Sequence, residues 1–324
     1  TLNEIKKDKI LNIKKIKIEN INKNNNYNVI FNETSSKVTL FLKKRHLDLV
    51  ILLGDRFETL AIAISCFLKK IPICHLHGGE TTLGSIDNSI RNAITSVSKY
   101  HFTANKTFME NVKKICGSED NIYSVGAMFL DNLSRREKIK KYNIEKKFKF
   151  EFKKKNILVT LHPETISKIN VKNQIQTVLM SLSKFKDILF IFTAPNMDFG
   201  SAIFFEEIRK FVNKNKNAVF IKSLGEKYYH SIISFSDAVL GNSSSGIIEV
   251  PYLRKGTINV GDRQKGRPQE KTIINAKFSK ISITKSIKKL YSKKFQAKLK
   301  VYNAKNYGAP GATKKIINQI INNL

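Results

Sequence analysis

Acidic and histidine side chains follow two apolar segments in the first half of the chain. Asp55 comes directly after the apolar run Leu49–Leu53, and the run Ile71–Leu76 leads into His77 and Glu80. Open parallel sheets bind ligands beyond the carboxyl ends of their strands, and carboxyl and imidazole groups commonly act as general acids and bases. The pattern predicts an acid–base site. In the alternative interpretation, Asp55 only caps the following helix.

Two further side chains have the same chemistry. Asp87 lies in the stretch SIDNSIR, and His162 follows a third apolar run in the stretch LHPE. Asp87 is either a helix N-cap or a carboxylate of the site, and His162 is either a structural histidine or part of the site. His75 and His77 have the spacing of metal ligands, but the other four histidines form no cluster with them, so we expect no metal ion.

A segment of small residues in the second half is the best candidate for binding phosphate. Residues 241–249 read GNSSSGIIE, between an apolar run and a helical pattern. Backbone N–H groups and hydroxyls at such a turn attract anions, although no Gly-Lys-Ser/Thr sequence of a Walker loop follows. An ordinary serine N-cap is the alternative. The expected contacts come from Asn242, Ser243, Ser244, Ser245 and Gly246, and from Arg263 and Arg267 in the later stretch GDRQKGR.

These residues need an alternating α/β framework to bring them together. In the first half, apolar runs predict strands and helical spacing predicts the segments between them. The expected strands are Leu49–Leu53, Ile71–Leu76, Tyr100–Ala104 and Ile122–Val125, and the expected helices are Phe57–Leu68, Ile86–Val97 and Thr107–Ile115. Residues 1–46 are only weakly periodic, and the charged stretch Ser134–Lys155 predicts a linker or a solvated helix.

The alternation starts again in the second half. The expected strands are Ile157–Leu161, Ile188–Thr193, Ala218–Ile221, Ala238–Leu240 and Thr257–Val260. The expected helices are Val171–Phe185, Phe204–Val212, Lys227–Phe235, Ser244–Val250 and Thr284–Tyr291. Continuous apolar strands predict parallel sheets covered on both faces. A length of 324 residues suits two such doubly wound domains, which we expect at 1–145 and 146–305, facing a shared cleft.

Composition narrows the class of protein. The formal net charge is +32, but only nine of the 58 basic residues are arginine and the lysines are spread along the chain. Nucleic-acid readers use arginine and interleaved aromatic rings, so we expect no specific nucleic-acid binding, and no apolar run is long enough to span a membrane. Cys66, Cys74 and Cys116 lack the spacing of a redox or metal motif, which predicts free thiols in a reducing cytoplasm.

Seven motifs in a fixed order resemble a known family. GDRFE, IPICHLHGGE, SIDNSIRNAIT, LHPET, GNSSSGIIEV, GDRQKGR and NYGAPGATKKI are similar to the hydrolysing UDP-N-acetylglucosamine 2-epimerases of bacterial sialic acid synthesis. The resemblance runs from about residue 48 to the C-terminus. It implies two Rossmann-like domains of the glycosyltransferase-B type, with a final helix at 306–324 that crosses back to the first domain.

The resemblance also implies a reaction. A base removes the C2 proton of the sugar while the nucleoside diphosphate leaves C1, and water then adds to the glycal to release the free 2-epimer. For UDP-N-acetylglucosamine the products are N-acetylmannosamine and UDP, without a cofactor. Carried over to this chain, Asp55 and Asp87 are acid–base candidates, His162 and the serines contact the diphosphate, and Glu249 holds the ribose. Arg56, Arg263 and Arg267 complete the expected nucleotide site.

The chain departs from the family pattern in two places. Some members have HIEGGE where this chain has HLHGGE, so the family's catalytic Glu is His77 here, and either His77 or Glu80 is expected to take its role. Residues 1–46 also lack the Gly-Thr-Arg loop of the family's first strand, from which we expect a missing strand–helix unit.

Two alternatives are open. The missing unit leaves a truncated, inactive nucleotide-sugar binder, and close relatives in the family imply an epimerase for a GDP-linked diacetamido sugar of legionaminic acid synthesis. The resemblance further implies a cytoplasmic homo-oligomer, dimeric or tetrameric.

Overall fold

The computed structural model describes residues 10, 12–19, 27–83, 85–135, 137, 139–164, 166–195 and 200–323. They belong to two compact units. Unit 1 takes in the chain as far as Thr81, then Ile86–Asp131 and the C-terminal part from Tyr307; unit 2 takes in Thr82–Ser85 and Asn132–Asn306. Among the described residues, no helix has the length and apolar character needed to cross a membrane.

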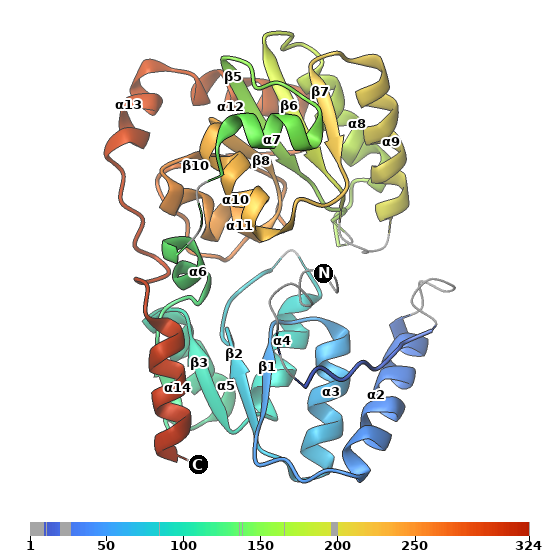
Figure 1. Cartoon of the computed structure of the whole chain (residues 1–324), viewed down its shortest axis with the longest axis vertical. Helices are drawn as coiled ribbons and strands as arrows, with labels where there is room; N and C mark the ends of the chain where they lie inside the picture. Colours follow the sequence, from blue (N-terminus) through green and yellow to red (C-terminus); the bar gives the residue numbers. More distant parts are fainter. Residues whose placement is uncertain are drawn as a thin grey trace. The chain divides into compact units, whose positions relative to one another are not determined.

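Unit 1 contains one parallel sheet in the order β1-β2-β3-β4 (Figure 1). Its strands are β1 (Val50–Leu53), β2 (Ile73–Leu76), β3 (Tyr100–Thr103) and β4 (Ile122–Ser124). Its helices are α2 (Tyr27–Lys43), α3 (Phe57–Leu68), α4 (Asp87–Ser96), α5 (Lys106–Cys116) and α14 (Ala312–Asn323), and α6 (Phe129–Arg135) lies where the chain passes into unit 2.

Helices pack on both faces of this sheet. Ile73 packs with Cys66 of α3 and Ile94 of α4, whereas its neighbour Cys74 packs with Ile316 of α14. Because successive residues of a strand point to opposite faces, α14 covers the face opposite to α3 and α4.

Helix α2 lies in the stretch that was expected to be weakly periodic. Its buried side chains are Ile30, Thr34, Val38 and Leu42, one at each fourth position. The polar Thr34 interrupts the apolar stripe in the sequence, but its hydroxyl donates to the carbonyl of Ile30 at 2.7 Å and is thereby satisfied in the interior.

Unit 2 contains a six-stranded parallel sheet. Its strands are β5 (Lys155–Thr160), β6 (Ile188–Thr193), β7 (Ala218–Ile221), β8 (Ala238–Gly241), β9 (Gly256–Val260) and β10 (Ile273–Ala276). Its helices are α7 (Lys141–Phe148), α8 (Val171–Leu182), α9 (Ser201–Lys214), α10 (Gly225–Phe235), α11 (Ser244–Ile248), α12 (Lys280–Leu290) and α13 (Lys293–Val301), with the 3-10 helix η2 (Val250–Leu253). Strand β10 and helix α13 are additional to the expected elements, and α7 lies within the stretch expected to be a linker or a solvated helix.

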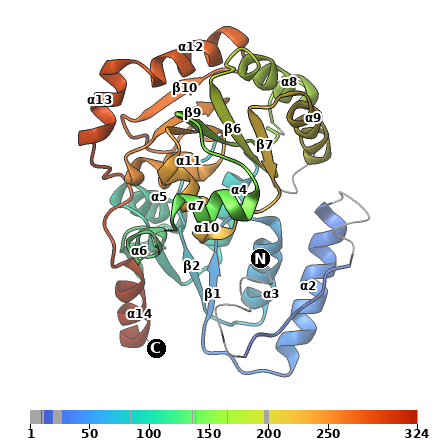
Figure 2. The ribbon, with the colours of Figure 1, turned by 45° about the horizontal axis from the view of Figure 1, so that its top comes forward.

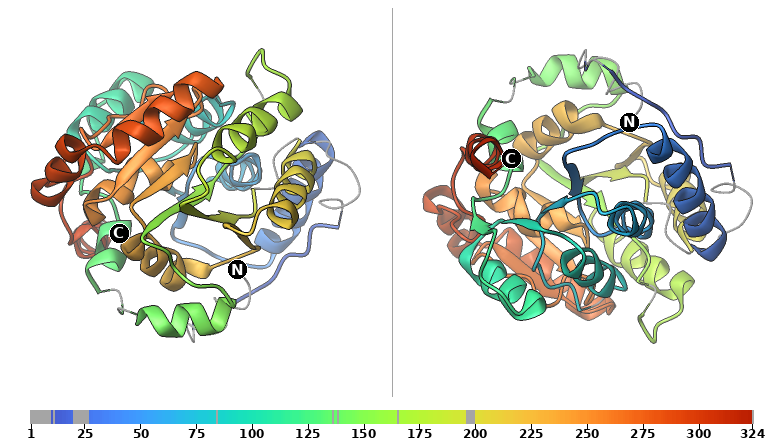
Figure 3. Two further views of the ribbon diagram at one scale, coloured as in Figure 1. Left: turned by 90° about the horizontal axis from the view of Figure 1, so that it is seen from above. Right: turned by 90° about the horizontal axis from the view of Figure 1, so that it is seen from below.

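The order of the strands, β10-β9-β8-β5-β6-β7, creates a switch point between β5 and β8. The chain winds outward from β5 through β6 and β7, and then returns to β8 on the other side. Helices α8 and α9 lie side by side (Figure 2), and α12 packs beside α8 on the same face (Figure 3). Helices α7 and α10 belong to the core of the opposite face. The expected α/β fold with two doubly wound parallel sheets is confirmed.

Two buried carboxylates anchor the chain where it returns to unit 1, one before the return and one after it. In unit 2, Glu270 Oε1 accepts hydrogen bonds from the backbone N–H groups of Lys305 and Asn306, both at 2.7 Å. In unit 1, Asp131 accepts from the backbone N–H groups of Gly311 and Thr313 at the start of α14. These hydrogen bonds lower the pKa of Asp131 despite the opposing effect of burial, so Asp131 holds α14 as an anion.

Candidate active site

Asp55 forms a partly buried ion pair at the carboxyl end of β1. The Nη2 atom of Arg91, on α4, donates to Asp55 Oδ2, and the exposed fractions of the two side chains are 2% for Arg91 and 27% for Asp55. The N-cap position of α3 belongs to Arg56, which makes no side-chain capping bond. Asp55 is therefore not the cap of that helix, and its charge is held by a guanidinium that cannot lose its proton at neutral pH.

His77 and Glu80 form a second pair beyond β2. His77 Nδ1 lies 2.9 Å from Glu80 Oε1, and Glu80 is only 4% exposed. An ionised carboxylate can only accept a hydrogen bond, so His77 carries its proton on Nδ1 in this pair. In the neutral ring with this tautomer, the lone pair lies on Nε2, on the far side from Glu80.

The turn that carries this pair is tightly constrained. His77 has φ +63° and Gly79 has φ +75°, the left-handed region that is costly for a side chain with a Cβ atom. A Cβ atom on Gly79 would lie 2.2 Å from the carbonyl oxygen of Phe108. Asn111 Nδ2 donates to the carbonyl of Gly79 at 2.8 Å. The strained backbone at His77 is thus held by packing and by one side-chain amide, as expected for a functional turn.

Arg91 joins the two pairs. Its Nη1 atom donates to the backbone carbonyl of Glu80 at 2.6 Å, while Nη2 donates to Asp55. One buried guanidinium therefore fixes the segment of Glu80 relative to the Asp55 carboxylate. Asp87 is the first residue of the same helix, at its positive end, and is half-buried.

His75 is a structural residue. Its Nε2 lies 3.0 Å from the carbonyl of Gly54 and its Nδ1 lies 3.1 Å from Thr95 Oγ1. Both ring nitrogens are therefore engaged, and burial lowers the pKa of His75 to about 4. The neutral ring ties the carboxyl end of β1 to that of β2, which brings Asp55 and His77 to the same edge of the sheet.

In unit 2, His162 and Asn242 meet at the switch point between β5 and β8. The backbone N–H of His162 donates to Asn242 Oδ1, and Asn242 Nδ2 donates to the carbonyl of His162, both at 2.8 Å. The side chain of Asn242 thus joins two strand ends. His162 is 4% exposed, and burial together with the charge of Arg263 lowers its pKa to about 3, so its ring is neutral at physiological pH.

The small residues after Asn242 begin helix α11. Ser243 is its N-cap and makes no side-chain capping bond, while Ser245 donates to Ser243 Oγ at 3.2 Å. Gly246 is required by packing, because a Cβ atom there would lie 2.9 Å from Thr257 Cγ2. Glu249 Oε2 lies 2.7 Å from Nε2 of the buried His230, which fixes the carboxylate next to this segment.

The stretch GDRQKGR packs against the same strand ends. Gln264 Nε2 donates to the carbonyl of Asn242 at 2.8 Å, and the backbone N–H of Arg263 donates to Glu164 Oε1 at 2.8 Å. Arg267 is 9% exposed. Burial raises the pKa of Glu164 against the effect of the hydrogen bond from the Arg263 backbone. The structure therefore brings His162, Asn242 and Arg263 together, with Arg263 supplying a positive charge.

Several structurally important residues of these clusters were absent from the sequence-based candidates. They are Arg91, Asn111, Glu164, His230 and Gln264. Arg91 and Glu164 lie inside motifs that were recognised, but their partners are far away in the sequence: Arg91 pairs with Asp55 and Glu164 with Arg263. The available signal for Arg91 was its position one helical turn before Ile94, which places it on the buried face of α4.

Comparisons with known proteins identify the family of this chain. Residues 2–321 match the family model described as UDP-N-acetylglucosamine 2-epimerase. A GDP/UDP-N,N'-diacetylbacillosamine 2-epimerase (hydrolyzing) of Campylobacter jejuni is 34% identical over 77% of this chain and 65% of its own length. The polysialic acid biosynthesis protein P7 of Escherichia coli is 35% identical over 79% and 65%, respectively. The chain thus spans about two thirds of the length of these relatives.

A solved structure shares the fold. The UDP-GlcNAc 2-epimerase of Neisseria meningitidis, bound to UDP-GlcNAc, superposes with a TM-score of 0.79 at 19% identity, and the match covers 96% of this chain and 84% of that one.

A third sequence relative supports the family assignment. A Legionella pneumophila UDP-N,N'-diacetylbacillosamine 2-epimerase (hydrolyzing) is 32% identical over 85% of this chain and 72% of its own length. The family match and the relatives above 30% identity lead to one conclusion: this chain belongs to the UDP-N-acetylglucosamine 2-epimerase family.

Proposed function

We propose that the protein is a hydrolysing nucleotide-sugar 2-epimerase. The observation that carries this proposal is the hydrogen-bonded cluster of unit 1, in which Arg91 connects Asp55 to the segment of the His77–Glu80 pair. Such a cluster offers groups that accept and return protons at one edge of a sheet, which is what epimerisation at a carbon next to the anomeric centre requires.

The first step is an elimination, for which we assign His77 as the base. Its Nε2 atom takes the C2 proton of the sugar, the C2–H electron pair forms the C1–C2 double bond, and the C1–O bond breaks. The nucleoside diphosphate leaves with the electron pair of the C1–O bond. Glu80, which accepts the Nδ1 proton, stabilises the imidazolium that forms.

The second step adds water across the double bond of the glycal. Hydroxide oxygen bonds to C1 and a proton bonds to C2, on the face opposite to the one that lost it. Inversion at C2 therefore calls for proton-transferring groups on two sides of the ring. Asp55 is our candidate for the second group, and Arg91, a positioning residue, holds it beside the His77 segment.

Unit 2 is proposed to bind the nucleoside diphosphate. Arg263 and the hydroxyls of Ser243 and Ser244 offer charge and hydrogen-bond donors to the phosphate oxygens, and Glu249, steadied by His230, is suited to accept from ribose hydroxyls. The neutral ring of His162 can donate a hydrogen bond without adding a buried charge. These contacts stabilise the leaving group as it gains negative charge.

For the sugar we propose a nucleotide-linked 2-acetamido sugar. UDP-N-acetylglucosamine is one candidate, with N-acetylmannosamine as its product. The names of the relatives at 34% and 32% identity refer to N,N'-diacetylbacillosamine, whereas a Neisseria meningitidis relative named UDP-N-acetylglucosamine 2-epimerase is 26% identical. The second candidate is therefore the diacetamido sugar, linked to UDP or GDP, and the higher identities support it. We propose that a sialic- or legionaminic-acid-type pathway consumes the product.

A substrate panel tests the proposal. The protein is incubated with the UDP- and GDP-linked forms of both sugars, and the free nucleotide and free sugar are identified by NMR, with UDP and GDP binding measured on the same sample. We expect one of the four substrates to yield free nucleoside diphosphate and the free 2-epimer in equal amounts. An epimer that stays linked to the nucleotide would contradict hydrolysis, and nucleotide binding without any turnover would favour the inactive binder.

We also propose a cytoplasmic homo-oligomer. The three cysteines of the chain are free thiols, with Cys66 and Cys74 buried, as suits a reducing compartment. Light scattering at several protein concentrations tests the assembly, and a monomeric mass throughout would contradict it.

A further inference from the structure

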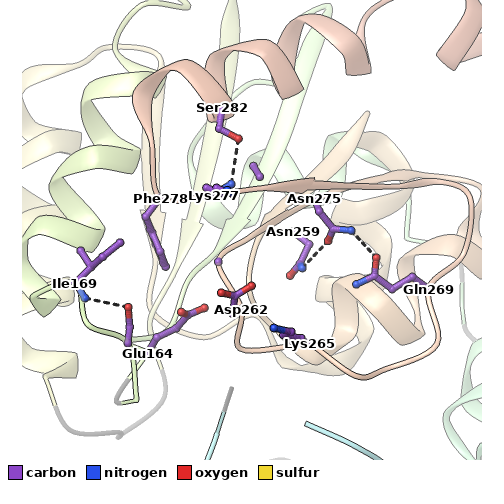
Figure 4. Close-up of a pocket in the computed structure, with 13 residues that line it drawn as sticks. Glu164, Ile169, Asn259, Asp262, Lys265, Gln269, Asn275, Lys277, Phe278 and Ser282 are labelled. Carbon is purple, nitrogen blue, oxygen red and sulfur yellow. Dashed lines mark hydrogen bonds between the residues drawn. The ribbon is translucent and has the colours of Figure 1, made fainter. Parts of the chain in front are cut away.

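Unit 2 contains a cavity of about 700 Å³ that the proposed reaction does not use (Figure 4). It lies beyond the carboxyl ends of β5, β9 and β10, and its walls come from the segment after β5, from both strands and from the start of α12. None of its lining residues belongs to the segment 242–249, and neither Arg263 nor Arg267 is among them. A cavity of this size accommodates a small molecule.

A row of three side-chain amides forms one wall. Asn259 Nδ2 donates to Asn275 Oδ1 at 2.9 Å, and Asn275 Nδ2 donates to Gln269 Oε1 at 2.6 Å. Figure 4 shows the row running from Gln269 inward to Asn259. Asn259 is 3% exposed, and its Oδ1 atom has no hydrogen-bond partner among the described residues. A buried acceptor without a donor is costly, so the inner end of the row favours a ligand that brings an N–H or O–H group.

The charges around the cavity balance. Glu164 and Asp262 contribute carboxyl groups, and Lys265 and Lys277 contribute ammonium groups. Because the two carboxylates offset the two ammonium groups, the cavity attracts an anion less than the arginines of the stretch GDRQKGR do. Hydroxyl groups donate to carboxylates and accept from ammonium groups, so they suit both kinds of charge. The cavity therefore suits a neutral ligand that carries several hydroxyls.

The remaining wall is apolar. Phe278 is half-buried and Ile169 is 39% exposed, and Figure 4 shows both on the side of the cavity opposite to Asn275 and Gln269. The cavity thus has an apolar side, which suits C–H groups, and a polar side of amides and carboxylates, which suits hydroxyls. Sugar rings have this division between an apolar face and polar edges.

We propose that this cavity is a second small-molecule site, which binds a neutral sugar of one or two rings independently of the nucleotide. Hydroxyl or acetamido N–H groups of the sugar donate to Asn259 Oδ1, the outer amides and the carboxylates bind the other hydroxyls, and Phe278 packs on the ring. Glu164 lines the cavity and also accepts from the backbone of Arg263. The occupied cavity is thereby connected to the segment next to the proposed diphosphate site.

Saturation-transfer NMR tests this site with N-acetylmannosamine, N-acetylglucosamine and N-acetylglucosamine 6-phosphate, each with and without saturating UDP. We expect the neutral sugars to bind in the presence of UDP. Asn275→Ala and Gln269→Ala, at exposed positions, should each raise the dissociation constant of the sugar about tenfold, the value of one hydrogen bond, with UDP affinity unchanged. The matched control is Asn323→Ala, an exposed amide of α14 in unit 1, which should change neither.

Four results would overturn the inference. They are the absence of any sugar signal in a sample that binds UDP, displacement of the sugar by UDP, sugar affinity in both amide variants equal to that of the wild type, and tighter binding of the phosphate ester than of the neutral sugars. The proposed epimerase fails separately, through absence of turnover. A protein that binds sugar beside UDP without turning over substrate would retain the second site and lose the proposed reaction.

Discussion

The proposed acid–base site of unit 1 and the candidate binding regions of unit 2 differ in how their buried polar groups are partnered. In unit 1, the groups of the proposed acid–base site are hydrogen-bonded to one another. Arg91 donates to the Asp55 carboxylate and to the backbone carbonyl of Glu80, and the Glu80 carboxylate pairs with His77. In unit 2, the buried oxygens Gln264 Oε1 and Asn259 Oδ1 have no partner among the described residues. A network that is complete without ligand holds its charges in place, whereas unfilled acceptors are satisfied by a ligand. The difference agrees with our proposal that unit 1 transfers protons and unit 2 binds the nucleotide.

The largest expected effect concerns the carboxylate of unit 1. Asp55→Asn keeps the shape of the side chain but removes the charge paired with Arg91 and the capacity to transfer a proton. We expect kcat/KM to fall about 10³-fold, the usual range for losing a general acid or base. UDP affinity should stay within about twofold, because we propose that unit 2 binds the nucleotide. Steady-state kinetics and calorimetry measure the two quantities. A wild-type rate in the variant would remove Asp55 from the mechanism.

The next prediction concerns Arg91 as a structural anchor. Arg91→Met leaves Asp55 without its partner and the carbonyl of Glu80 without its donor, so we expect the free energy of unfolding to fall by about 3 kcal/mol. Urea denaturation measures it. The control is Arg56→Gln in the same unit, whose pair with Glu58 is exposed and should change stability by less than about 1 kcal/mol. Equal losses in both variants would show that burial of the pair in unit 1 does not matter.

Stability should also depend on pH through the buried histidines. Burial lowers the pKa of His162 to about 3 and the pKa values of His75 and His101 to about 4. Below the unfolded value of about 6.5, the unfolded chain binds protons that the folded chain does not, so stability falls as pH decreases from about 6.5 towards 4.

Each of these histidines should contribute about 1.4 kcal/mol per pH unit in that range. His162→Gln should therefore reduce the slope of the free energy of unfolding against pH by the equivalent of about one proton. Urea denaturation between about pH 4.5 and about pH 7, which covers most of the titration, measures this slope. His46→Gln, at an exposed position, is the control and should leave the slope unchanged. A slope in the His162 variant equal to that of the wild type would mean that His162 is protonated in the folded protein.

The smallest expected effect concerns the binding unit. Glu249→Gln keeps a hydrogen-bond acceptor but weakens the contacts with ribose and with His230, so the dissociation constant of UDP should rise about tenfold, the value of one charge-assisted hydrogen bond. We expect kcat to stay within about twofold, because the side chain binds ground and transition states alike. Glu226→Gln, exposed on α10, should change neither. A fall in kcat at constant affinity would assign Glu249 to the chemistry instead.

The alternation of apolar runs was enough to predict most of the elements. Helix α3 lies at the expected residues, and the strands that precede Asp55 and His77 end where the sequence predicted. Strand β5, which precedes His162, ends one residue earlier than expected. Buried parallel strands leave an uninterrupted apolar signal, which makes their ends visible in the sequence. Helix α2 escaped notice since Thr34 occupies one of its four buried positions. Strand β10 is four residues long and includes Asn275, so its pattern is weak.

Hydrogen bonds and ion pairs between residues far apart in the chain could not be predicted from the sequence. The bond from Arg91 to Asp55 spans 36 positions and that from Arg263 to Glu164 spans 99. Both depend on strand order, which no local pattern encodes. The same holds for the amide row, where Asn259 and Asn275 become neighbours only because β9 and β10 pair in that register. The resemblance to the family supplied the reaction that the residues alone left open.

Solvent deuterium at C2 tests the central proposal most directly. The protein is incubated in deuterium oxide with the substrate that the panel identifies, and the released sugar is examined by proton NMR. A base in unit 1 that removes the C2 proton, followed by addition of solvent to the glycal, predicts one deuterium at C2 of every free 2-epimer and equimolar nucleoside diphosphate. Release of nucleotide and sugar with hydrogen retained at C2 would show simple hydrolysis and contradict the proposed mechanism.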